Sequence, residues 1–341
     1  MPPRQELPQR WKDIIRFWSP DDWRDYAVKR LHALLKKHQV CSTREMEARL
    51  TDFGSNLNPR VEPHHLTTAR EMLKLNIVSE KYAPLYSLPN TPLTSISPII
   101  ARKELLHEAF RNFTKDQFCG DVAEKIVFAS MEKALNLSIE PHTLGQVSQI
   151  GDLKTTNPLD TYALLPFTDI TGKRQVAIIG IEIKNIREWI YPQSIEIWKA
   201  LKACIDLDCT PIIISRAFHY TTMTFFRDIG VFGFETRKQY LSSKLWKEPL
   251  YTPLKKELYF RDMILWKEDK PDPKVTRFFS DLLPRYISRT VSTFEHNKHL
   301  IAQYAQGPLH DEKTNISNRS KLMSQFREDF WHLHNLTRTW W

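Results

Sequence analysis

The fold expected for this chain is decided by two nearby segments, Asn157-Pro158-Leu159-Asp160 and Val176-Ala177-Ile178-Ile179-Gly180-Ile181-Glu182-Ile183-Lys184. The longer segment alternates as a β-strand does, with Gly180, Glu182 and Lys184 on one face and isoleucines on the other. Packing of the isoleucine face against helices would leave a carboxylate and an ammonium group side by side on a rigid strand. A second carboxylate, Asp160, ends the loop before the preceding strand. The sequence therefore predicts that two carboxylates and one lysine meet here.

Helices and strands alternate around these segments, in the region 98–240. The elements expected in chain order are a helix Gly120–Asn136, strands Thr161–Leu165 and Val176–Lys184, a helix Pro192–Ile205, a strand Thr210–Ser215, a helix Tyr220–Arg227 and a strand Val231–Glu235. This order predicts an α/β domain, in which helices flank a mixed central sheet. The regions on either side, 1–97 and 241–341, are predicted to be mainly helical.

The first region carries three expected helices, Asp21–His38, Thr43–Phe53 and His64–Leu75. The third has an apolar face, and Asn76 is expected to end it as a left-handed cap before a small hairpin. The region resembles a winged-helix domain, which implies a recognition helix that exposes four residues to nucleic acid: Thr67, Thr68, Arg70 and Lys74. The alternative is a helical bundle that only braces the next domain.

Composition sets looser limits on the chain. Its 341 residues allow two or three domains and a sizeable core. Lysine plus arginine exceed aspartate plus glutamate by 49 − 40 = 9, and this positive net charge favours polyanionic partners. Four scattered cysteines without CxxC spacing indicate reduced thiols in a cytoplasmic protein rather than a zinc site. No signal-peptide core or membrane-length apolar run is present in the sequence, so a soluble protein without a membrane partner is expected.

The central region resembles the PD-(D/E)XK nucleases, which have the restriction-endonuclease-like fold. Pro158-Leu159-Asp160 corresponds to the PD element of that family, with one extra residue between proline and aspartate. Glu182-Ile183-Lys184 corresponds to its (D/E)XK element. The order of the surrounding helices and strands agrees, over roughly 140 residues of the chain. A surface ion pair on an edge strand is the structural alternative.

The resemblance implies a magnesium site, in which manganese could substitute. Asp160 and Glu182 would hold the ion, the Ile183 backbone carbonyl would be a further ligand, and Lys184 would position water or stabilise developing charge. Glu124 interrupts the apolar face of the helix that begins at Gly120, and the resemblance implies that it is a further site residue. The alternative is that Glu124 is an ordinary carboxylate near a helix N-terminus, where the helix dipole favours its charge. Gln193 would orient phosphate or water, unless it is an ordinary polar residue of a first helical turn.

These features together predict a magnesium-dependent DNA endonuclease, a hydrolase of phosphodiester bonds that would serve restriction or defence, recombination or repair. Because one such site cuts one strand, a homodimer or a partner protein is expected for a duplex break. The alternative is a catalytically inactive nucleic-acid-binding protein that keeps the nuclease fold. Only nine glycines and no glycine-rich phosphate loop are present in the sequence, so an ATP-driven motor is not expected.

Overall fold

The computed structural model describes residues 14–52, 58–135, 146–169, 171–307, 309–311 and 313–334. Phe53 and Asn136, the expected ends of two helices, lie outside these ranges. The chain forms two compact units, Met1–Lys115 with Lys244–Leu265 and Asp116–Ser243 with Trp266–Trp341. The boundaries expected after residues 97 and 240 are therefore replaced by boundaries at Lys115, Ser243 and Leu265. No helix in the described ranges is long and apolar enough to cross a membrane.

The first unit begins with a capped helix. Ser19 accepts a hydrogen bond from the Asp22 N–H (3.2 Å), and the Asp22 carboxylate accepts one from the Ser19 N–H (2.8 Å), which forms a capping box. The helices and strands of this unit are α2 (Pro20–His38), β1 (Cys41–Ser42), α3 (Thr43–Glu47), π-helix η1 (Ala48–Asp52), α4 (Pro63–Met72), β2 (Asn76–Ser79), β3 (Leu85–Ser87), α5 (Leu93–Phe113), η3 (Ser243–Lys247) at the boundary, α9 (Tyr251–Glu257) and β11 (Met263–Trp266), which also reaches the boundary.

The strands of the first unit form a small antiparallel sheet in the order β1-β3-β2. Helices α2 and α4 pack against each other through buried apolar side chains, among them Leu31 and Leu66. Up to Ser87 the order of elements is therefore helix, strand, helix, helix, strand, strand.

Helix α5 belongs to the first unit because ion pairs join it to its neighbours there. The Lys103 ammonium lies 2.7 Å from both carboxylate oxygens of Glu45 in α3, and this pair is buried. The Arg102 guanidinium lies 2.6 Å from Glu257 at the end of α9. The distant segment Lys244–Leu265 thus completes this unit through contacts such as that of Arg102 with Glu257, 155 residues apart, which local sequence patterns did not indicate.

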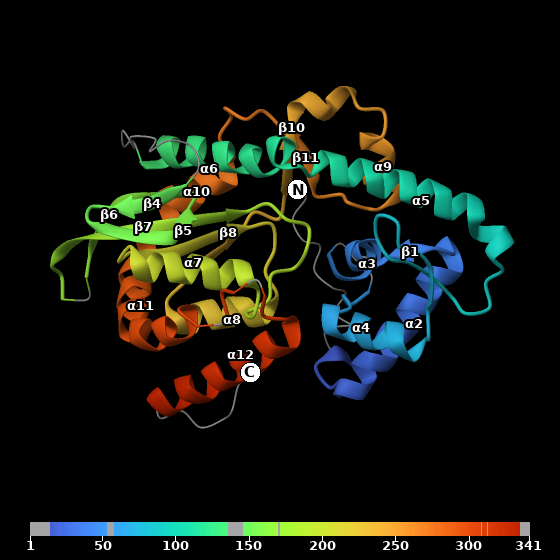
Figure 1. The fold of residues 1–341 in the computed structure, drawn as a ribbon, viewed down its shortest axis with the longest axis horizontal. Helices are drawn as coiled ribbons and strands as arrows, with labels where there is room; N and C mark the ends of the chain where they lie inside the picture. Colours follow the sequence, from blue (N-terminus) through green and yellow to red (C-terminus); the bar gives the residue numbers. More distant parts are fainter. Residues whose placement is uncertain are drawn as a thin grey trace. The chain divides into compact units, whose positions relative to one another are not determined.

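The second unit is an α/β domain, and Figure 1 shows its helices on both sides of a twisted sheet. Its elements are η2 (Asp116–Phe118), α6 (Gly120–Leu135), β4 (Val147–Ile150), β5 (Leu153–Leu159), β6 (Thr161–Thr168), β7 (Arg174–Lys184), α7 (Ile195–Asp206), β8 (Thr210–Ser215), α8 (Tyr220–Ile229), β9 (Phe232–Glu235), β10 (Gln239–Ser242), α10 (Pro273–Arg277), π-helix η4 (Phe278–Leu282), α11 (Leu283–Ala305) and α12 (Ile316–Leu333).

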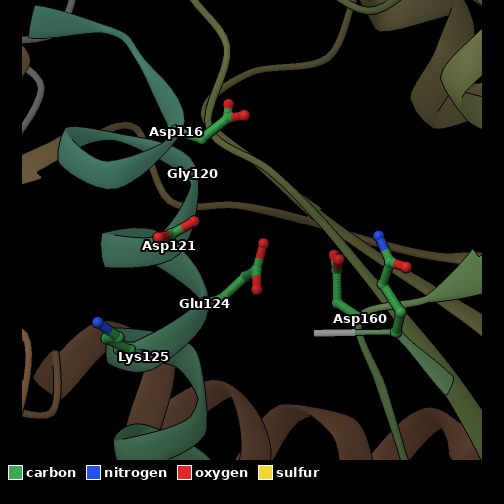
Figure 2. Close-up of a pocket in the computed structure, with 7 residues that line it drawn as sticks. Asp116, Gly120, Asp121, Glu124, Lys125 and Asp160 are labelled. Atoms are coloured by element: carbon green, nitrogen blue, oxygen red, sulfur yellow. The ribbon is translucent and has the colours of Figure 1, made fainter. Parts of the chain in front are cut away.

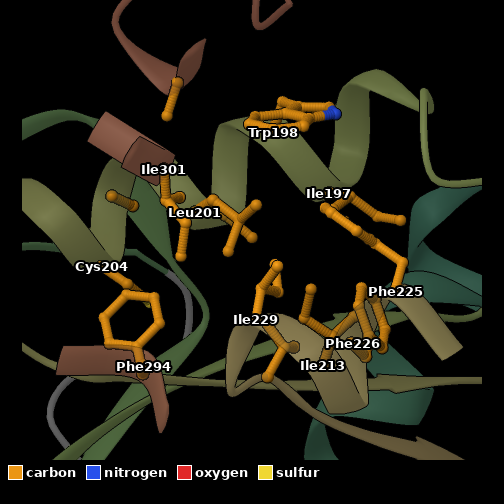
Figure 3. Close-up of a cluster of buried hydrophobic side chains, with 14 of the residues drawn as sticks. Ile197, Trp198, Leu201, Cys204, Ile213, Phe225, Phe226, Ile229, Phe294 and Ile301 are labelled. Atoms are coloured by element: carbon orange, nitrogen blue, oxygen red, sulfur yellow. The ribbon is translucent and has the colours of Figure 1, made fainter. Parts of the chain in front are cut away.

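The main sheet has the strand order β6-β7-β8-β9. Strands β6 and β7 are antiparallel, whereas β7, β8 and β9 run parallel, so the expected mixed sheet flanked by helices is confirmed. On β7, Ile179, Ile181 and Ile183 are buried as the alternation predicted. The opposite face is covered too, by a core that α7, α8, α11 and α12 build with the sheet (Figure 3).

Gly180 permits the close approach of this core to β7. A Cβ atom at this position would lie 2.6 Å from Cys209 Sγ and 2.7 Å from Leu159 Cδ1, closer than real Cβ contacts. A side chain at Gly180 would therefore push α7 and its following loop away from the strand that carries Glu182.

Two boundaries in the second unit differ from those expected. Asn157, Pro158 and Leu159 form the end of β5, which pairs with β4 in a separate two-stranded sheet, rather than a loop. Helix α7 begins at Ile195, after the cap residue Ser194, rather than at Pro192. Gln193 consequently lies in the turn before the helix.

Candidate active site

Asp160 is the single residue between β5 and β6. Its Oδ2 atom accepts a hydrogen bond of 2.5 Å from the Ile183 N–H. Thr161, the first residue of β6, pairs with Ile181 on β7. The Asp160 side chain, just before β6, therefore adds one more hydrogen bond to β7 beyond the last backbone pair. The sequence prediction that Asp160 and the Glu182–Lys184 segment meet therefore holds in the structure.

Glu182 and Lys184 lie on β7, an interior strand of the sheet. The Lys184 Nζ forms an ion pair with Glu182 Oε1, as the alternation of β7 led us to expect. Glu182 is only 7% exposed. Since β7 has a strand on either side and the glutamate is buried, the alternative of a surface ion pair on an edge strand is wrong.

Glu124 comes to the same place from α6. It is half-buried, and its carboxylate projects towards Asp160 across a cavity of about 350 Å³ (Figure 2). The cavity is lined by Asp116, Gly120, Asp121, Glu124, Lys125, Gln146 and Asp160. Its wall is therefore rich in carboxylates, to which α6, the η2 turn and the β5–β6 junction contribute.

Burial and mutual repulsion disfavour the ionised forms of these carboxylates. Burial, followed by the charge of Asp160, raises the pKa of Glu124 to about 7 and that of Glu182 to about 7. Burial also raises the pKa of Asp160, although Lys184 and the Ile183 N–H oppose the shift. The helix dipole remains the alternative reason for a carboxylate at this position of α6.

Lys184 is the cation at the centre of this acidic group. Burial disfavours its charge, but the charges of Glu182 and Asp160 outweigh burial and raise the pKa of the ammonium. Glu196, in the first turn of α7, adds to the same effect. Lys184 is therefore held protonated beside two carboxylates.

The donor set suits a hard divalent cation, because Asp160 and Glu182 offer only oxygen atoms and Mg²⁺ takes one or two carboxylates together with water. A cation between them would favour the ionised forms of both carboxylates, against the burial that raises both pKa values and the Asp160 charge that adds to the rise for Glu182. Among the described residues, no group of three or more His, Cys, Asp or Glu side chains is arranged as a ready-made metal site. The Ile183 carbonyl as a third ligand remains a prediction.

Gln193 is not brought into contact with these groups by any interaction that the structure shows. It lies half-buried in the turn before α7, and Glu196 is the residue of this segment whose charge acts on Lys184. Glu196, Asp116, Asp121 and Gln146 were not predicted from the sequence. Glu196, Asp116 and Asp121 offered only an acidic residue in a first helical turn or close to Gly120, which is common on ordinary helices, and Gln146 offered no signal.

The four residues expected on the recognition helix differ in their surroundings. Thr67 is exposed on α4, and Thr68 is half-buried. The Arg70 guanidinium instead donates a hydrogen bond to Thr43 Oγ1 (2.7 Å) and lies 5.5 Å from the Tyr86 ring centroid, so its expected exposure is wrong. This arginine joins α4 to α3 and β3.

Lys74 is exposed and has the left-handed φ of 48°. The helix ends at Met72, so Lys74 supplies the left-handed residue that we had expected at Asn76. Asn76 instead begins β2, and its side-chain amide donates to the Pro89 carbonyl (3.1 Å). The exposed candidates for nucleic-acid contact on this helix and its exit are therefore Thr67 and Lys74.

Comparisons with protein-family models, with curated proteins and with solved structures gave no match.

Proposed function

We propose that this chain is a magnesium-dependent DNA endonuclease of the PD-(D/E)XK type, a hydrolase of phosphodiester bonds. The observation that carries the proposal is the convergence of Asp160, Glu182 and Lys184 at one end of a mixed sheet, with Asp160 hydrogen-bonded to the Ile183 N–H. Burying Glu182 and partly burying Asp160 and Lys184 is costly, and a fold that served binding alone would have no need of all three. The alternative remains a nucleic-acid-binding protein without catalytic activity.

In this proposal, Mg²⁺, or Mn²⁺ in its place, would supply an activated water and neutralise charge on the phosphate. Asp160 and Glu182 would hold the ion through carboxylate oxygens. Lys184 would orient the attacking water or stabilise the negative charge that develops on phosphate oxygens, as a compact and permanently protonated donor. Glu124, which faces Asp160 across the cavity, would bind water of the ion's hydration shell.

The first unit supports the choice of DNA as the substrate. Its order of helix, strand, helix, helix, strand and strand, with the sheet order β1-β3-β2, is the order of a winged-helix domain. Thr67 and Lys74 would contact the duplex, while Thr68 would lie at the edge of the contact and Arg70 would brace the helix. The net charge of +9 is consistent with a polyanionic partner.

A cytoplasmic location and an assembly with two active sites belong to the same proposal. All four cysteines are buried and unpaired, as expected where thiols stay reduced. A homodimer or a partner nuclease would supply the second cut of a duplex break. Restriction or defence, recombination and repair are the processes in which such an enzyme would act.

The test is cleavage of supercoiled, linear and branched DNA with Mg²⁺ or Mn²⁺, with a chelator as the blank. We expect Lys184→Ala, Asp160→Ala and Glu182→Ala to lose at least about 100-fold in rate, the lower range for removal of a group that stabilises charge. Lys202→Ala is the matched control, because it removes another lysine ion pair of the second unit, with Asp206 in α7. Equal cleavage by wild type and all three site variants would refute the site.

A further inference from the structure

Ser215 is the last residue of β8 and the register partner of Lys184 on β7. The two strands are parallel, and side chains at paired positions of neighbouring strands point to the same face, with the strands about 4.8 Å apart. The Ser215 hydroxyl and the Lys184 ammonium-bearing side chain are therefore neighbours at the same end of the sheet.

The Ser215 hydroxyl is buried without a partner. The residue is 1% exposed, and within the described part of the chain its Oγ makes no hydrogen bond. Its backbone carbonyl is engaged, because it accepts the Thr236 N–H (2.8 Å). Glu235, the register partner of Ser215 on its other side, is also engaged: it accepts the Phe218 N–H (2.9 Å) and pairs with Arg237. Buried hydroxyls without partners are uncommon, and each calls for an explanation.

Lys184 and the metal ion of the proposed function would compete for the Glu182 carboxylate, and a second hydrogen-bond acceptor for Lys184 would remove this competition. Its ammonium pairs with Glu182 Oε1, and the same carboxylate is needed for the ion of the proposed function. An ammonium group and a divalent cation cannot both be fully bound to one buried carboxylate without strong repulsion. The four-carbon stem of lysine lets the ammonium move, and its three donors require new acceptors when it does.

We propose that Ser215 is a positioning residue that accepts a hydrogen bond from Lys184 when Glu182 binds the metal ion. Lys184 then has two positions: one on Glu182 in the metal-free protein, and one on Ser215 Oγ in the metal-bound protein. This inference rests on the proposed function. It explains why a hydroxyl is kept, buried and unbonded, beside the lysine. Glu196 is the competing acceptor, because its charge also acts on Lys184.

The experiment compares Ser215→Ala with a serine whose hydroxyl is fully used. Ser130 is also buried, and its hydroxyl donates to the Ile126 carbonyl (2.6 Å) and accepts the Asp272 N–H (2.9 Å). For wild type, Ser215→Ala, Ser130→Ala and Glu196→Gln, we would measure Mn²⁺ affinity by calorimetry without DNA. Thermal unfolding in chelator and the kcat and KM of plasmid cleavage complete the comparison.

Ser215→Ala should unfold at the wild-type temperature or above it, because it removes an unsatisfied group. It should bind Mn²⁺ about three- to ten-fold more weakly and lower kcat about ten-fold without changing KM, the typical effect of one lost hydrogen bond. Ser130→Ala should show the opposite pattern, with a lower unfolding temperature and unchanged Mn²⁺ affinity and kcat. Glu196→Gln should change Mn²⁺ affinity and kcat less than Ser215→Ala does.

Three results would overturn the inference while leaving the proposed function intact. The first is a Ser215→Ala protein that binds Mn²⁺ and cleaves as the wild type does. The second is a Ser215→Ala protein destabilised as much as Ser130→Ala, which would mean that the hydroxyl already has a partner in the metal-free protein. The third is a larger loss in Glu196→Gln than in Ser215→Ala. A wild-type protein that neither binds Mn²⁺ nor cleaves DNA would remove both the inference and the proposed function.

Discussion

The substitution Gly180→Ala tests how closely the second unit is packed behind the candidate active site. The added Cβ would lie 2.6 Å from Cys209 Sγ, 2.7 Å from Leu159 Cδ1 and 2.9 Å from Cys204 Sγ. All three neighbours are buried, so none can move into solvent. Overpacking of this kind costs about 1 to 3 kcal/mol, and the lower backbone entropy of alanine returns less than about 1 kcal/mol.

We therefore expect Gly180→Ala to lower the free energy of unfolding by about 1 to 2 kcal/mol in urea titrations followed by circular dichroism. Cleavage should fall as well, because the clash lies two residues before Glu182 on β7. For stability, Gly120→Ala is the matched control: its added Cβ meets nothing closer than 3.8 Å, at Asp116 Oδ1. A double variant with Cys209→Ala, which removes the nearest atom, should recover part of the lost stability.

Equal stability of Gly180→Ala and Gly120→Ala would refute the predicted clash. A double variant in which Cys209→Ala only adds its own destabilisation, without any recovery, would refute it too. In either case the sheet and α7 would be separated by more space than the structure shows, and the position of Glu182 would not depend on Gly180.

Four further single-residue substitutions test the two units. Arg70→Ala should lower the free energy of unfolding by about 1 kcal/mol, because it removes the hydrogen bond to Thr43. Lys74→Ala should leave the free energy of unfolding unchanged, but it should weaken DNA binding and flatten the salt dependence of the affinity in titrations at several salt concentrations. Burial, followed by the charges of Arg44 and Lys103, lowers the pKa of His107 to about 4. The unfolded chain therefore binds a proton at this histidine below about pH 6.5, whereas the folded protein binds it only near pH 4. The contribution of His107 to stability should therefore fall by about 2 kcal/mol from pH 7 to pH 4.5, and urea unfolding should show it as the difference in pH dependence between wild type and His107→Leu. Asp160→Asn should abolish Mn²⁺ binding in calorimetry. The fold should be kept, because the amide oxygen can still accept a hydrogen bond from the Ile183 N–H. Unchanged Mn²⁺ affinity would exclude Asp160 as a ligand.

Much of the second unit could be predicted from sequence because its signals are local. The alternation of β7 depends only on neighbouring residues, and it predicted both the buried isoleucines and the Glu182–Lys184 pair. Helix α6 and the parallel strands followed from their own apolar patterns. The junction at Asp160 was placed beside β7 by the same reasoning, although β5 was missed because a proline-containing segment with polar residues is weak evidence for a strand.

The N-terminal predictions show where local signals mislead. Arg70 occupies a position that a helical pattern makes exposed, but Thr43 and Tyr86 lie within its reach and hold it inward. The left-handed residue after α4 was expected at an asparagine, yet the helix ends earlier and Lys74 adopts that conformation. Propensity gave the wrong residue because the pairing of β2 with β3 fixes where the strand begins.

By itself, the sequence determined strands β6 to β9, helices α6, α7 and α8, and the residue types that meet at the end of the main sheet. Only the tertiary structure decided which distant segments complete each unit and which side chains surround the site. It brought Glu257 to Arg102, Ser215 to the position beside Lys184, and Glu196 rather than Gln193 towards the lysine. The physical reason is that periodicity reflects contacts within a few residues, whereas burial, ion pairing and pKa depend on charges and atoms brought together from far along the chain.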